Sequence, residues 1–338
     1  MTVRIGINGF GRIGRNYLRA ARLLGADIEV VAVNDLTSPE TLAHLLKYDS
    51  THGRFDGEVT VEGSHLILDS GPVAVLAERE PKALPWSDLG VDVVIESTGL
   101  FTSKETAGAH VDAGAKRVII SAPGSGVDAT FVVGVNDDQF DPATDVVVSN
   151  ASCTTNCFVP MVKVLDDAFG VESGLMTTVH AYTNDQNLLD LPHKDLRRSR
   201  AAAVNIVPAS SGAARATSLV LESMKGRLDG AALRVPVADG SITDFTAVLP
   251  AGVTVAQVNA AYEAAASSGP LSKVLVYTED PIVSTDIVGS PASCTFDAGL
   301  TMAMPSASGI TLVKVSGWYD NEWGYANRLV DLSLVVGA

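Results

Sequence analysis

Cysteine is scarce in this sequence. Among 338 residues there are three, Cys153, Cys157 and Cys294, which is too few and too odd a number for a disulfide framework. The opening letters MTVRIGING read directly into a strand, without the basic and apolar segments of a secretion signal. We therefore expect a protein of the reducing cytoplasm.

Acidic residues outnumber basic residues in this sequence, and long apolar runs are missing. The chain has 24 Lys and Arg against 39 Asp and Glu, a formal net charge of −15 at pH 7. Nucleic acids and anionic membranes attract basic surfaces, so we expect neither as a partner. No apolar run is long enough to span a bilayer, and the 46% of hydrophobic residues is typical of a globular chain. Because no second ligand pair with zinc spacing accompanies the cysteines, no metal is expected.

Linkers, repeats and low-complexity tracts are also missing, and the length suggests two packed domains. Apolar runs that are continuous rather than alternating, with helical periodicity between them, predict a parallel sheet covered on both faces. These runs are VRIGIN, IEVVAV, VDVVIES, RVIIS, TFVVGV and DVVVSN. The stretch VTVEGSHLILDSGPVAV predicts attached antiparallel strands, and Ser103 is a predicted helix N-cap. Residues 1–151 therefore read as a doubly wound α/β domain of the Rossmann type.

The pattern changes after Cys153. A helical face that ends at Gly170 comes first, and helical patterns recur at 213–224 and 255–267. Between them lie the strand-like runs GLMTTVHAYT, ALRVPVADGSITDFTAVLP and ITLVKVSGWYD. This order predicts an α+β domain with a mainly antiparallel sheet, followed by a last helix near the C-terminus.

A glycine-rich turn follows the first strand. INGFGRIGR carries Gly9, Gly11 and Gly14 in G-x-G-x-x-G spacing, which permits a tight turn, a close approach to a pyrophosphate, and close packing of helix on strand. Asp35 comes 21 residues after Gly14, where its carboxylate can accept from a ribose 2′-hydroxyl and repel a 2′-phosphate. The pattern favours NAD over NADP. The simpler alternatives are an ordinary tight turn and a solvated loop carboxylate.

The stretch SNASCTTNC places Cys153 among small polar residues where a strand ends and a helix begins. The thiolate is the reactive form of cysteine, and a helix N-terminus lowers the pKa of a thiol. His180, near the end of an apolar strand, is the best candidate for a neighbouring base, with a structural role as the alternative. Cys157 and Cys294 read as small core residues. Arg234 lies among apolar strand residues and needs a partner if it is buried.

Ordered motifs then span the whole chain: INGFGRIGR, VND, STG, ISAPG, NASCTTNC, HAYTNDQ, LPHKDLRRSRAAA, SSGAAR and WYDNEWGYANR. Together they closely resemble the phosphorylating glyceraldehyde-3-phosphate dehydrogenase family. The resemblance implies oxidation of D-glyceraldehyde 3-phosphate to 1,3-bisphosphoglycerate with NAD and inorganic phosphate. Cys153 would form a thiohemiacetal and then a thioester, with His180 as the base.

The resemblance also implies an organisation. Residues 1–151 would form the NAD-binding domain, joined by the C-terminal helix 319–338, and 152–318 the catalytic domain. The loop 183–203 would pack between the subunits of a homotetramer. The resemblance thus predicts both the domain boundaries and the association of subunits.

Further site residues follow from the resemblance. Cofactor contacts are expected from Gly9, Gly11, Arg12, Ile13, Gly14, Asp35, Arg79, Ser121 and Asn321. An inorganic-phosphate site is expected from Ser152, Thr154, Arg198, Ser211 and Gly212, and a site for the substrate's own phosphate from Thr183 and Arg234. Hydroxyl donors and guanidinium forks suit phosphate oxygens.

Three alternatives stay open. An erythrose-4-phosphate dehydrogenase would share the cysteine, the histidine and the cofactor fold but would hydrolyse the thioester. A cysteine hydrolase would use Cys153 and His180 alone, which leaves the glycine turn and Asp35 unexplained. A binding protein could have kept the fold and lost activity, although every catalytic position is suitably occupied.

Overall fold

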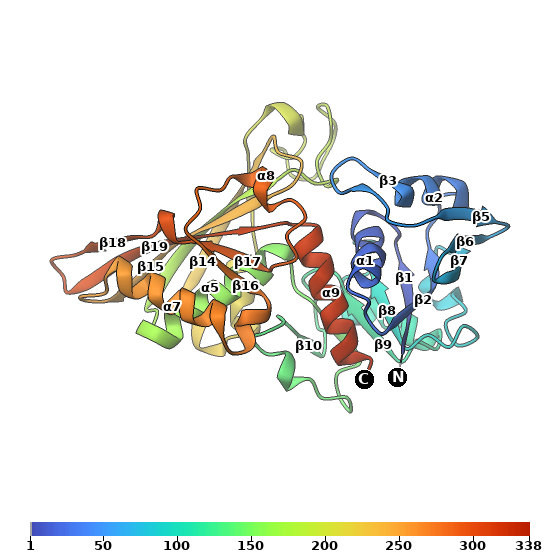
Figure 1. Ribbon diagram of the computed structural model, residues 1–338, viewed down its shortest axis with the longest axis horizontal. Coiled ribbons are helices and arrows are strands. Elements are labelled where there is room, and N and C mark those ends of the chain that lie inside the picture. Colours follow the sequence, from blue (N-terminus) through green and yellow to red (C-terminus); the bar gives the residue numbers. More distant parts are fainter. Residues whose placement is uncertain (1) are drawn as a thin grey trace. The chain divides into compact units, whose positions relative to one another are not determined.

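The computed structural model describes residues 2–338, and the chain divides into two compact units. Unit 1 runs to Ser152 and includes Ala326–Ala338, and unit 2 is Cys153–Tyr325. Figure 1 shows that each unit contains a sheet flanked by helices. Among the described residues no helix combines the length and the apolar character needed to cross a bilayer.

Unit 1 is built on a sheet whose central strands are parallel. Its strands are β1 Val3–Asn8, β2 Ile28–Asn34, β5 Val59–Glu62, β6 His65–Leu68, β7 Gly71–Leu76, β8 Val93–Glu96, β9 Arg117–Ile120, β10 Ala129–Thr130 and β11 Val147–Ser149. They lie in the order β10-β11-β9-β8-β1-β2-β7-β6-β5. From β7 to β11 this is the 3-2-1-4-5-6 order of the Rossmann fold, so the predicted fold is confirmed. The predicted antiparallel strands are β5, β6 and β7.

Helices cover this sheet. They are α1 Arg12–Leu23, α2 Pro39–Lys47, α3 Lys104–Ala107, α4 Ala109–Asp112 and α9 Trp323–Val336, and a small ribbon β3 Tyr48–Asp49 with β4 Gly53–Arg54 follows α2. The last part of α9 packs within unit 1: the buried Tyr17 hydroxyl donates to Ser333 Oγ at 3.0 Å, and Arg117 donates to the Val336 carbonyl at 3.0 Å. The apolar runs of β1 and β8 are buried on both faces, which explains why they do not alternate.

Two local expectations for unit 1 need correction. The run TFVVGV predicts a strand over 130–135, but pairing stops at Thr130 and a turn follows. The Asn136 amide holds this turn, accepting from the Val132 N–H at 2.8 Å and donating to the Thr130 carbonyl at 2.9 Å. Ser103 caps a helix as predicted, through a bond from the Thr106 N–H, but that helix is interrupted at Gly108 and forms α3 and α4.

Unit 2 contains the mainly antiparallel sheet that the sequence predicts. Its strands are β12 Ser173–Ala181, β13 Val207–Ser210, β14 Leu228–Val235, β15 Ser241–Pro250, β16 Leu275–Thr278, β17 Cys294–Asp297, β18 Met302–Pro305 and β19 Ile310–Tyr319. The order is β13-β14-β12-β15-β19-β17-β16, with β18 also paired to β19. The parallel pairs are β12 with β14 and β16 with β17, and the other pairs are antiparallel.

The helices of unit 2 are α5 Cys153–Phe169, α6 Ala213–Ala216, α7 Val255–Ser267 and α8 Ser284–Ile287. Helix α5 packs on the sheet through Phe158, whose ring meets Phe245 edge-on at 4.9 Å between centroids, and it ends before Gly170 as predicted. Helix α7 matches its predicted bounds. The single helix expected over 213–224 is wrong: α6 ends at Ala216, and short 3₁₀ turns follow at Thr217–Leu219 and Glu222–Met224.

Candidate functional site

In unit 1, the glycine turn has the geometry that its spacing predicts. Gly9 has φ +93°, a conformation that side chains rarely adopt, and a Cβ there would lie 2.7 Å from the Thr98 nitrogen. A Cβ on Gly14 would lie 2.3 Å from the Gly9 carbonyl oxygen, so α1 can pack on the turn because Gly14 has none. Around Gly11 nothing lies within 4 Å of the corresponding position. The turn is therefore tight on the protein side and open at Gly11, where α1 begins.

A cavity of about 340 Å³ lies at this turn. Its lining includes Asn8, Gly9, Gly11, Asn34, Asp35, Leu36, Glu78, Arg79, Ser97 and Thr98. It sits at the carboxyl ends of β1 and β8, where the strand order reverses, which is where open α/β sheets bind ligands. The open glycine and the uncapped start of α1 fit a pyrophosphate, and the Asp35 carboxylate fits a ribose. The residues present thus fit a dinucleotide.

Asp35 is held rigidly beside this cavity. Its two carboxylate oxygens accept from the Phe10 N–H at 3.1 Å and the Thr37 N–H at 3.0 Å. Arg79 is exposed and lines the same cavity. The structure therefore brings together Gly9, Gly11, Asp35 and Arg79 among the predicted cofactor contacts.

Other predicted cofactor contacts lie elsewhere. Arg12 is bound to Asp49 at 2.6 Å, and Ile13 is half-buried in the first turn of α1. Ser121 follows β9 and does not line the described cavity. Asn321 belongs to unit 2, where its Oδ1 accepts from the Ser241 hydroxyl at 2.7 Å.

A buried polar network supports the floor of the cavity, and sequence reasoning missed it. The Glu96 carboxylate accepts from Asn8 Nδ2 at 2.6 Å and from the Thr98 N–H at 2.9 Å, and His110 Nε2 lies 3.0 Å away. The Trp86 indole can only donate, so its 3.0 Å bond makes His110 Nδ1 the acceptor and leaves the proton on Nε2, facing Glu96. The network fixes Asn8 and Thr98, two residues of the cavity wall.

In unit 2, Cys153 and His180 come together as predicted from their positions in the sequence. Cys153 begins α5, and its Sγ lies 3.5 Å from Nε2 of His180, which is the next-to-last residue of β12. The residue before Ser152, Ala151, has φ +55°, a strained conformation for alanine that turns the chain from β11 into α5. The backbone thus places the sulfur at a helix start, where backbone N–H groups point at it.

Two short contacts meet at Nδ1 of His180, which lies 2.7 Å from the Ala181 carbonyl oxygen and 2.7 Å from Arg234 Nη1. The carbonyl can only accept and the guanidinium can only donate, so the two contacts favour opposite tautomers. The tautomer that donates from Nδ1 to the carbonyl is the one whose Nε2 can accept a proton from Cys153. Arg234 Nη1 donates to the same carbonyl at 3.0 Å, so the partner that the sequence requires for Arg234 is found here.

One electrostatic expectation is wrong. The sequence predicts a lowered pKa for the Cys153 thiol, but burial raises it to about 11, outweighing the lowering by the Arg234 charge, the Thr154 hydroxyl and the helix-start N–H groups. Burial and the charge of Arg234 lower the pKa of His180 to about 3. The resting pair is therefore a thiol beside a neutral imidazole, and activation depends on proton transfer to His180 as the sulfur attacks.

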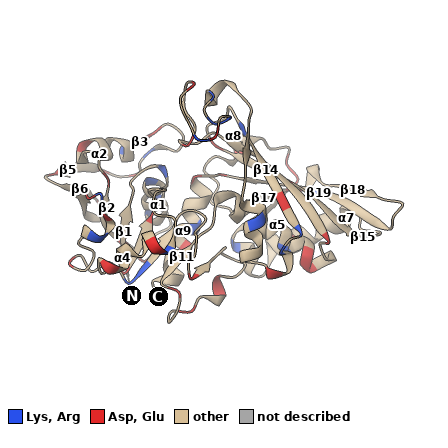
Figure 2. Ribbon diagram, turned by 180° about the vertical axis from the view of Figure 1, so that it is seen from behind, with Lys and Arg blue, Asp and Glu red and all other residues tan. Residues whose placement is uncertain are grey.

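Arg198 is the first of the predicted phosphate-binding residues to place relative to Cys153 and His180. The positive charge of Arg198 contributes to the lowered pKa of both His180 and Arg234. Arg198 is also bound to Asp185, and it donates to the Ser210 carbonyl at 3.4 Å, next to Ser211. Figure 2 shows basic and acidic residues in the loops at the top of the view, and the loop that carries Arg198 also contains the pair Arg200 and Asp190, 3.1 Å apart.

The other predicted phosphate-binding residues lie next to the ends of helices and strands of unit 2. Ser211 and Gly212 precede α6, and the Ser211 hydroxyl accepts from the Ala213 N–H at 3.2 Å. Thr183 follows β12 and is half-buried, and Ser152 directly precedes Cys153. Thr154 is buried, and its Oγ1 lies 2.8 Å from the Tyr319 hydroxyl rather than facing open space.

Two further groups near Cys153 were not singled out from the sequence. Thr178 shares a strand face with His180, two residues away, and its Oγ1 lies 2.8 Å from the Tyr319 hydroxyl. The Tyr319 ring meets His180 edge-on, with centroids 5.8 Å apart. The period-two spacing in TTVHAYT was the available signal for Thr178, whereas nothing local marks Tyr319.

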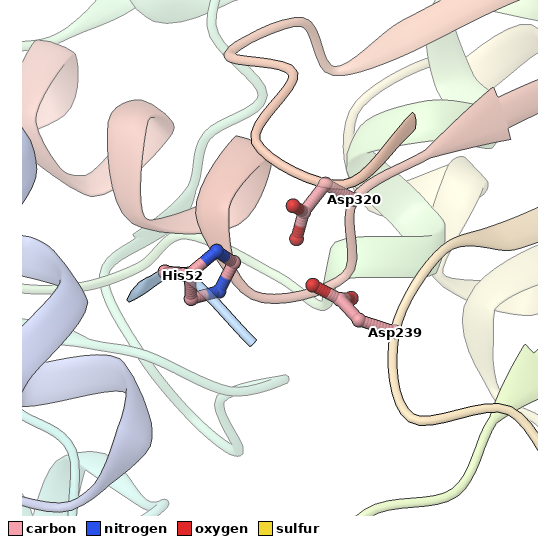
Figure 3. Close-up of side chains that lie close together, drawn as sticks. All are labelled: His52, Asp239 and Asp320. Atoms are coloured by element: carbon pink, nitrogen blue, oxygen red, sulfur yellow. The ribbon is translucent and has the colours of Figure 1, made fainter. Parts of the chain in front are cut away.

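A pair of buried carboxyl groups, Asp239 and Asp320, lies beside the segment that carries Asn321 (Figure 3). Asp320 accepts from the N–H groups of Gly289 at 2.7 Å and Trp323 at 2.6 Å, which fixes that segment. Burial and the charge of Asp320 raise the pKa of Asp239 to about 8, so at neutral pH Asp239 keeps its proton and shares it with Asp320. Sequence reasoning missed this pair, because its members are 81 residues apart.

Comparison with known proteins agrees with this geometry. A family described as "Glyceraldehyde 3-phosphate dehydrogenase, NAD binding domain" matches residues 3–104, and "Glyceraldehyde 3-phosphate dehydrogenase, C-terminal domain" matches residues 152–321. The chain is 60% identical to glyceraldehyde-3-phosphate dehydrogenase of Streptomyces coelicolor, 62% to glyceraldehyde-3-phosphate dehydrogenase 1 of Streptomyces avermitilis and 56% to that of Geobacillus stearothermophilus. Each alignment covers all of this chain and 99% of the relative.

These matches agree with the order of motifs, the Rossmann sheet and the paired Cys153 and His180. They confirm the predicted fold, NAD as the cofactor and an NAD-dependent oxidoreductase as the class of protein. The chain belongs to the glyceraldehyde-3-phosphate dehydrogenase family.

Proposed function

We propose that the protein oxidises D-glyceraldehyde 3-phosphate, with NAD and inorganic phosphate, to 1,3-bisphosphoglycerate. The observation that carries the proposal is that the Cys153 sulfur, at the start of α5, lies 3.5 Å from His180 Nε2, with Arg234 beside the pair. A nucleophile, a base and cationic groups for phosphate are the parts that this reaction needs. The resemblance of the motifs supports the choice of substrate.

NAD would be held in unit 1 by the glycine turn, Asp35 and Arg79, and it supplies the acceptor for the two electrons of the oxidation. Asp35 would accept from the ribose hydroxyls, and its charge would disfavour a 2′-phosphate. Asn321 and Ser121 stay predicted contacts of the cofactor. The predicted catalytic domain is 152–318, with 319–338 returning to the NAD-binding domain; the helix itself begins at Trp323, and the compact unit 1 resumes at Ala326.

The first step of the proposed reaction takes place at Cys153. As the sulfur attacks the aldehyde carbon, the thiol proton passes to His180 Nε2 and a carbon–sulfur bond forms, and the carbonyl oxygen takes that proton from His180 to become the hydroxyl of a thiohemiacetal. In the oxidation the C–H bond of that carbon breaks, its hydrogen leaves with two electrons, for which bound NAD would be the acceptor, and the hydroxyl proton passes to the neutral His180. The product on Cys153 is a thioester.

Phosphate completes the reaction. An oxygen of inorganic phosphate attacks the thioester carbon, the carbon–sulfur bond breaks, and the sulfur leaves as a thiolate that takes its proton back from His180. Arg198, Ser211 and Gly212, with Ser152 and Thr154, would hold the attacking phosphate. Arg234 and Thr183 would hold the phosphate of the substrate. Guanidinium groups suit both tasks because they donate two parallel bonds to phosphate oxygens.

The requirement for phosphate tests this proposal. NADH formation by the purified protein with glyceraldehyde 3-phosphate and NAD should continue only when inorganic phosphate is present. Without phosphate a single burst of NADH, equal at most to the number of active sites, is expected, because the thioester then has no acceptor. The measurement is absorbance at the NADH band over time, with arsenate as a second acceptor.

The alternatives give other outcomes. Steady turnover without phosphate, or a clear preference for erythrose 4-phosphate, would show that water attacks the thioester and would overturn the assignment. Hydrolysis of an ester or amide without NAD would favour a cysteine hydrolase. Binding of NAD without any burst would favour a protein that has lost activity.

We also propose that the protein is a cytoplasmic homotetramer, in which the loop 183–203 packs between subunits. Large apolar side chains in and next to this loop are 59–82% exposed in the single chain, namely Leu188, Leu189, Leu191, Leu196, Val204 and Ile206. Sedimentation should therefore give the mass of four chains, and Leu196→Asp should lower it, whereas Leu175→Asp, at an exposed residue outside the loop, serves as the comparison. A monomeric wild-type protein would contradict the proposal.

A further inference from the structure

Three neighbouring strands of unit 1 end in polar residues that stand in one row. Asn8 of β1 is in register with Asn34 of β2 on one side and with Glu96 of β8 on the other. All three residues are buried, at the end of the sheet where the cofactor cavity lies. Polar groups buried in this way need hydrogen-bond partners, and these three find them in one another and in the walls of the cavity.

The orientation of both amides in the row is determined. Asn34 Nδ2 donates to Asn8 Oδ1 at 2.7 Å, which leaves Asn8 Nδ2 to donate to Glu96 Oε2 at 2.6 Å. Asn34 also holds the backbone of Glu78, because its Nδ2 donates to the Glu78 carbonyl and its Oδ1 accepts from the Glu78 N–H, each at 2.8 Å. Glu78 and Arg79 line the cavity. The position of Glu96 is thereby linked to the segment that carries Arg79.

The other oxygen of Glu96 holds a second segment of the cavity wall. Its Oε1 accepts from the Thr98 N–H at 2.9 Å and from the Thr98 hydroxyl. The Thr98 hydroxyl in turn accepts from the Leu100 N–H at 3.0 Å. Thr98 and Leu100 both line the cavity. One carboxylate therefore joins two separate segments of the wall, because one oxygen is bonded to β1 and the other to the turn after β8.

His110 and Trp86 orient this carboxylate from behind the cavity wall. Both are fully buried, and neither belongs to the described lining of the cavity. His110 Nε2 lies 3.0 Å from Glu96 Oε2, and the Trp86 indole donates to His110 Nδ1 at 3.0 Å. The Trp86 ring lies against β1 where Gly6 has no side chain, since a Cβ there would lie 2.8 Å from the ring. Because the indole can only donate, the His110 proton is on Nε2 and points to the carboxylate.

We propose that His110 is a positioning residue for NAD, which holds the Glu96 carboxylate and through it keeps the cofactor cavity in shape before NAD binds. A cavity that is already ordered binds its ligand more tightly, because binding then does not have to offset the ordering of side chains. Hydrogen bonds in series also strengthen one another in a dry interior. The inference rests on the proposed placement of NAD in this cavity, and it is independent of the aldehyde that is oxidised.

The rival explanation is stability alone. His110 also meets the Phe101 ring edge-on, with centroids 6.5 Å apart, and packing of this kind stabilises the fold whatever the cavity binds. His110→Leu removes both the donor and the acceptor of the imidazole. His110→Gln is the conservative variant, because its amide keeps one donor and one acceptor and removes the ring. Tyr17→Phe is the matched control, since it removes another buried bond of unit 1, to Ser333 Oγ at 3.0 Å, from a residue outside the described cavity lining.

The test is calorimetric titration with NAD and with ADP-ribose, without aldehyde or phosphate, at a temperature where thermal unfolding shows every variant to be folded. ADP-ribose has the pyrophosphate and the adenosine ribose but no nicotinamide, so it reports on the cavity at the glycine turn. His110→Leu should weaken both ligands equally, about tenfold, the lower end of the range for one hydrogen bond to a charged group. His110→Gln and Tyr17→Phe should stay within about twofold of the wild type. Alkylation of Cys153 without NAD should proceed at the wild-type rate in all three variants.

Several results would overturn the inference. Unchanged affinities in His110→Leu would leave stability as the role of His110. Equal losses in Tyr17→Phe would trace the effect to general destabilisation, and equal losses in His110→Gln would trace it to the ring contact with Phe101. A loss for NAD without one for ADP-ribose would place the effect outside this cavity. Because no aldehyde is present, weaker binding by His110→Leu supports the inference even in a protein that does not oxidise glyceraldehyde 3-phosphate, and unchanged binding contradicts it even in one that does.

Discussion

Cys153→Ala should abolish NADH formation from glyceraldehyde 3-phosphate. The variant has no sulfur to attack the aldehyde carbon, so neither the thiohemiacetal nor the thioester can form. The expected loss is about 10⁴-fold or more in kcat, the scale seen when the nucleophile of a covalent mechanism is removed. The measurement is initial rate with saturating substrate, NAD and phosphate, together with the NADH burst in the absence of phosphate.

Cys157→Ala is the matched control for this variant. Cys157 lies one turn further along α5, is fully buried, and contacts the Gly317 carbonyl at 3.6 Å rather than His180. Its loss should lower the unfolding free energy by about 1 kcal/mol through lost packing and leave kcat near that of the wild type. Turnover that survives in Cys153→Ala, or that disappears equally in Cys157→Ala, would contradict the assignment of Cys153 as the nucleophile.

His180→Asn should have the second largest effect, and its sign follows from the two pKa values. Burial raises the pKa of the Cys153 thiol to about 11, so at neutral pH the sulfur keeps its proton unless a neighbour takes it. Burial and Arg234 lower the pKa of His180 to about 3, so its imidazole is neutral and can take it. Asparagine cannot accept that proton. We expect kcat at neutral pH to fall about 10²- to 10⁴-fold, the usual contribution of a general base.

The pH profile distinguishes loss of the base from general damage. In His180→Asn the alkylation of Cys153 should become slower at neutral pH and recover as the pH rises toward the pKa of the buried thiol, because hydroxide then replaces the missing base. His65→Asn, at an exposed position of β6, should leave both the rate and the profile unchanged. If His180→Asn alkylates like the wild type while kcat falls, the role of His180 lies in a later step and activation of the thiol is contradicted.

The contrast between these two residues shows why neither is sufficient alone. Cys153 sits at a helix start, which favours the thiolate, yet burial opposes it more strongly. His180 is kept neutral by the same burial and by a neighbouring charge. A thiol that is hard to ionise and a base that is unprotonated form a pair in which the proton moves when substrate is attacked.

Several parts of this protein could be predicted from local sequence. The glycine turn is one, because the conformation of Gly9 and the missing Cβ of Gly14 are properties of single residues in fixed spacing. The parallel sheet of unit 1 is another, since continuous apolar runs such as VRIGIN require burial on both faces. Helix α7 has the bounds that its helical pattern predicts, and a capping box formed by Thr254 and Gln257 fixes its N-terminal end.

Predictions from local sequence were wrong where contacts between distant residues set the secondary structure or the pKa. The run TFVVGV is apolar enough for a strand, but the Asn136 side chain takes over the hydrogen bonds of Val132 and Thr130 and makes a turn. The pattern over 213–224 predicts one helix, but the α-helix ends at Ala216 and a 3₁₀ turn follows. The pKa of Cys153 was predicted from its helix start, and the opposing effect of burial depends on residues far away in the chain.

Residue types and short spacings were enough to predict the family, the order of the motifs and the pairing of Cys153 with His180. The folded chain adds which nitrogen of His180 faces the sulfur, which guanidinium lies beside it, and that Thr178, Tyr319 and Thr154 meet in the same interior. Those features require distances and burial, and residues 165 positions apart acquire a distance only when the chain folds.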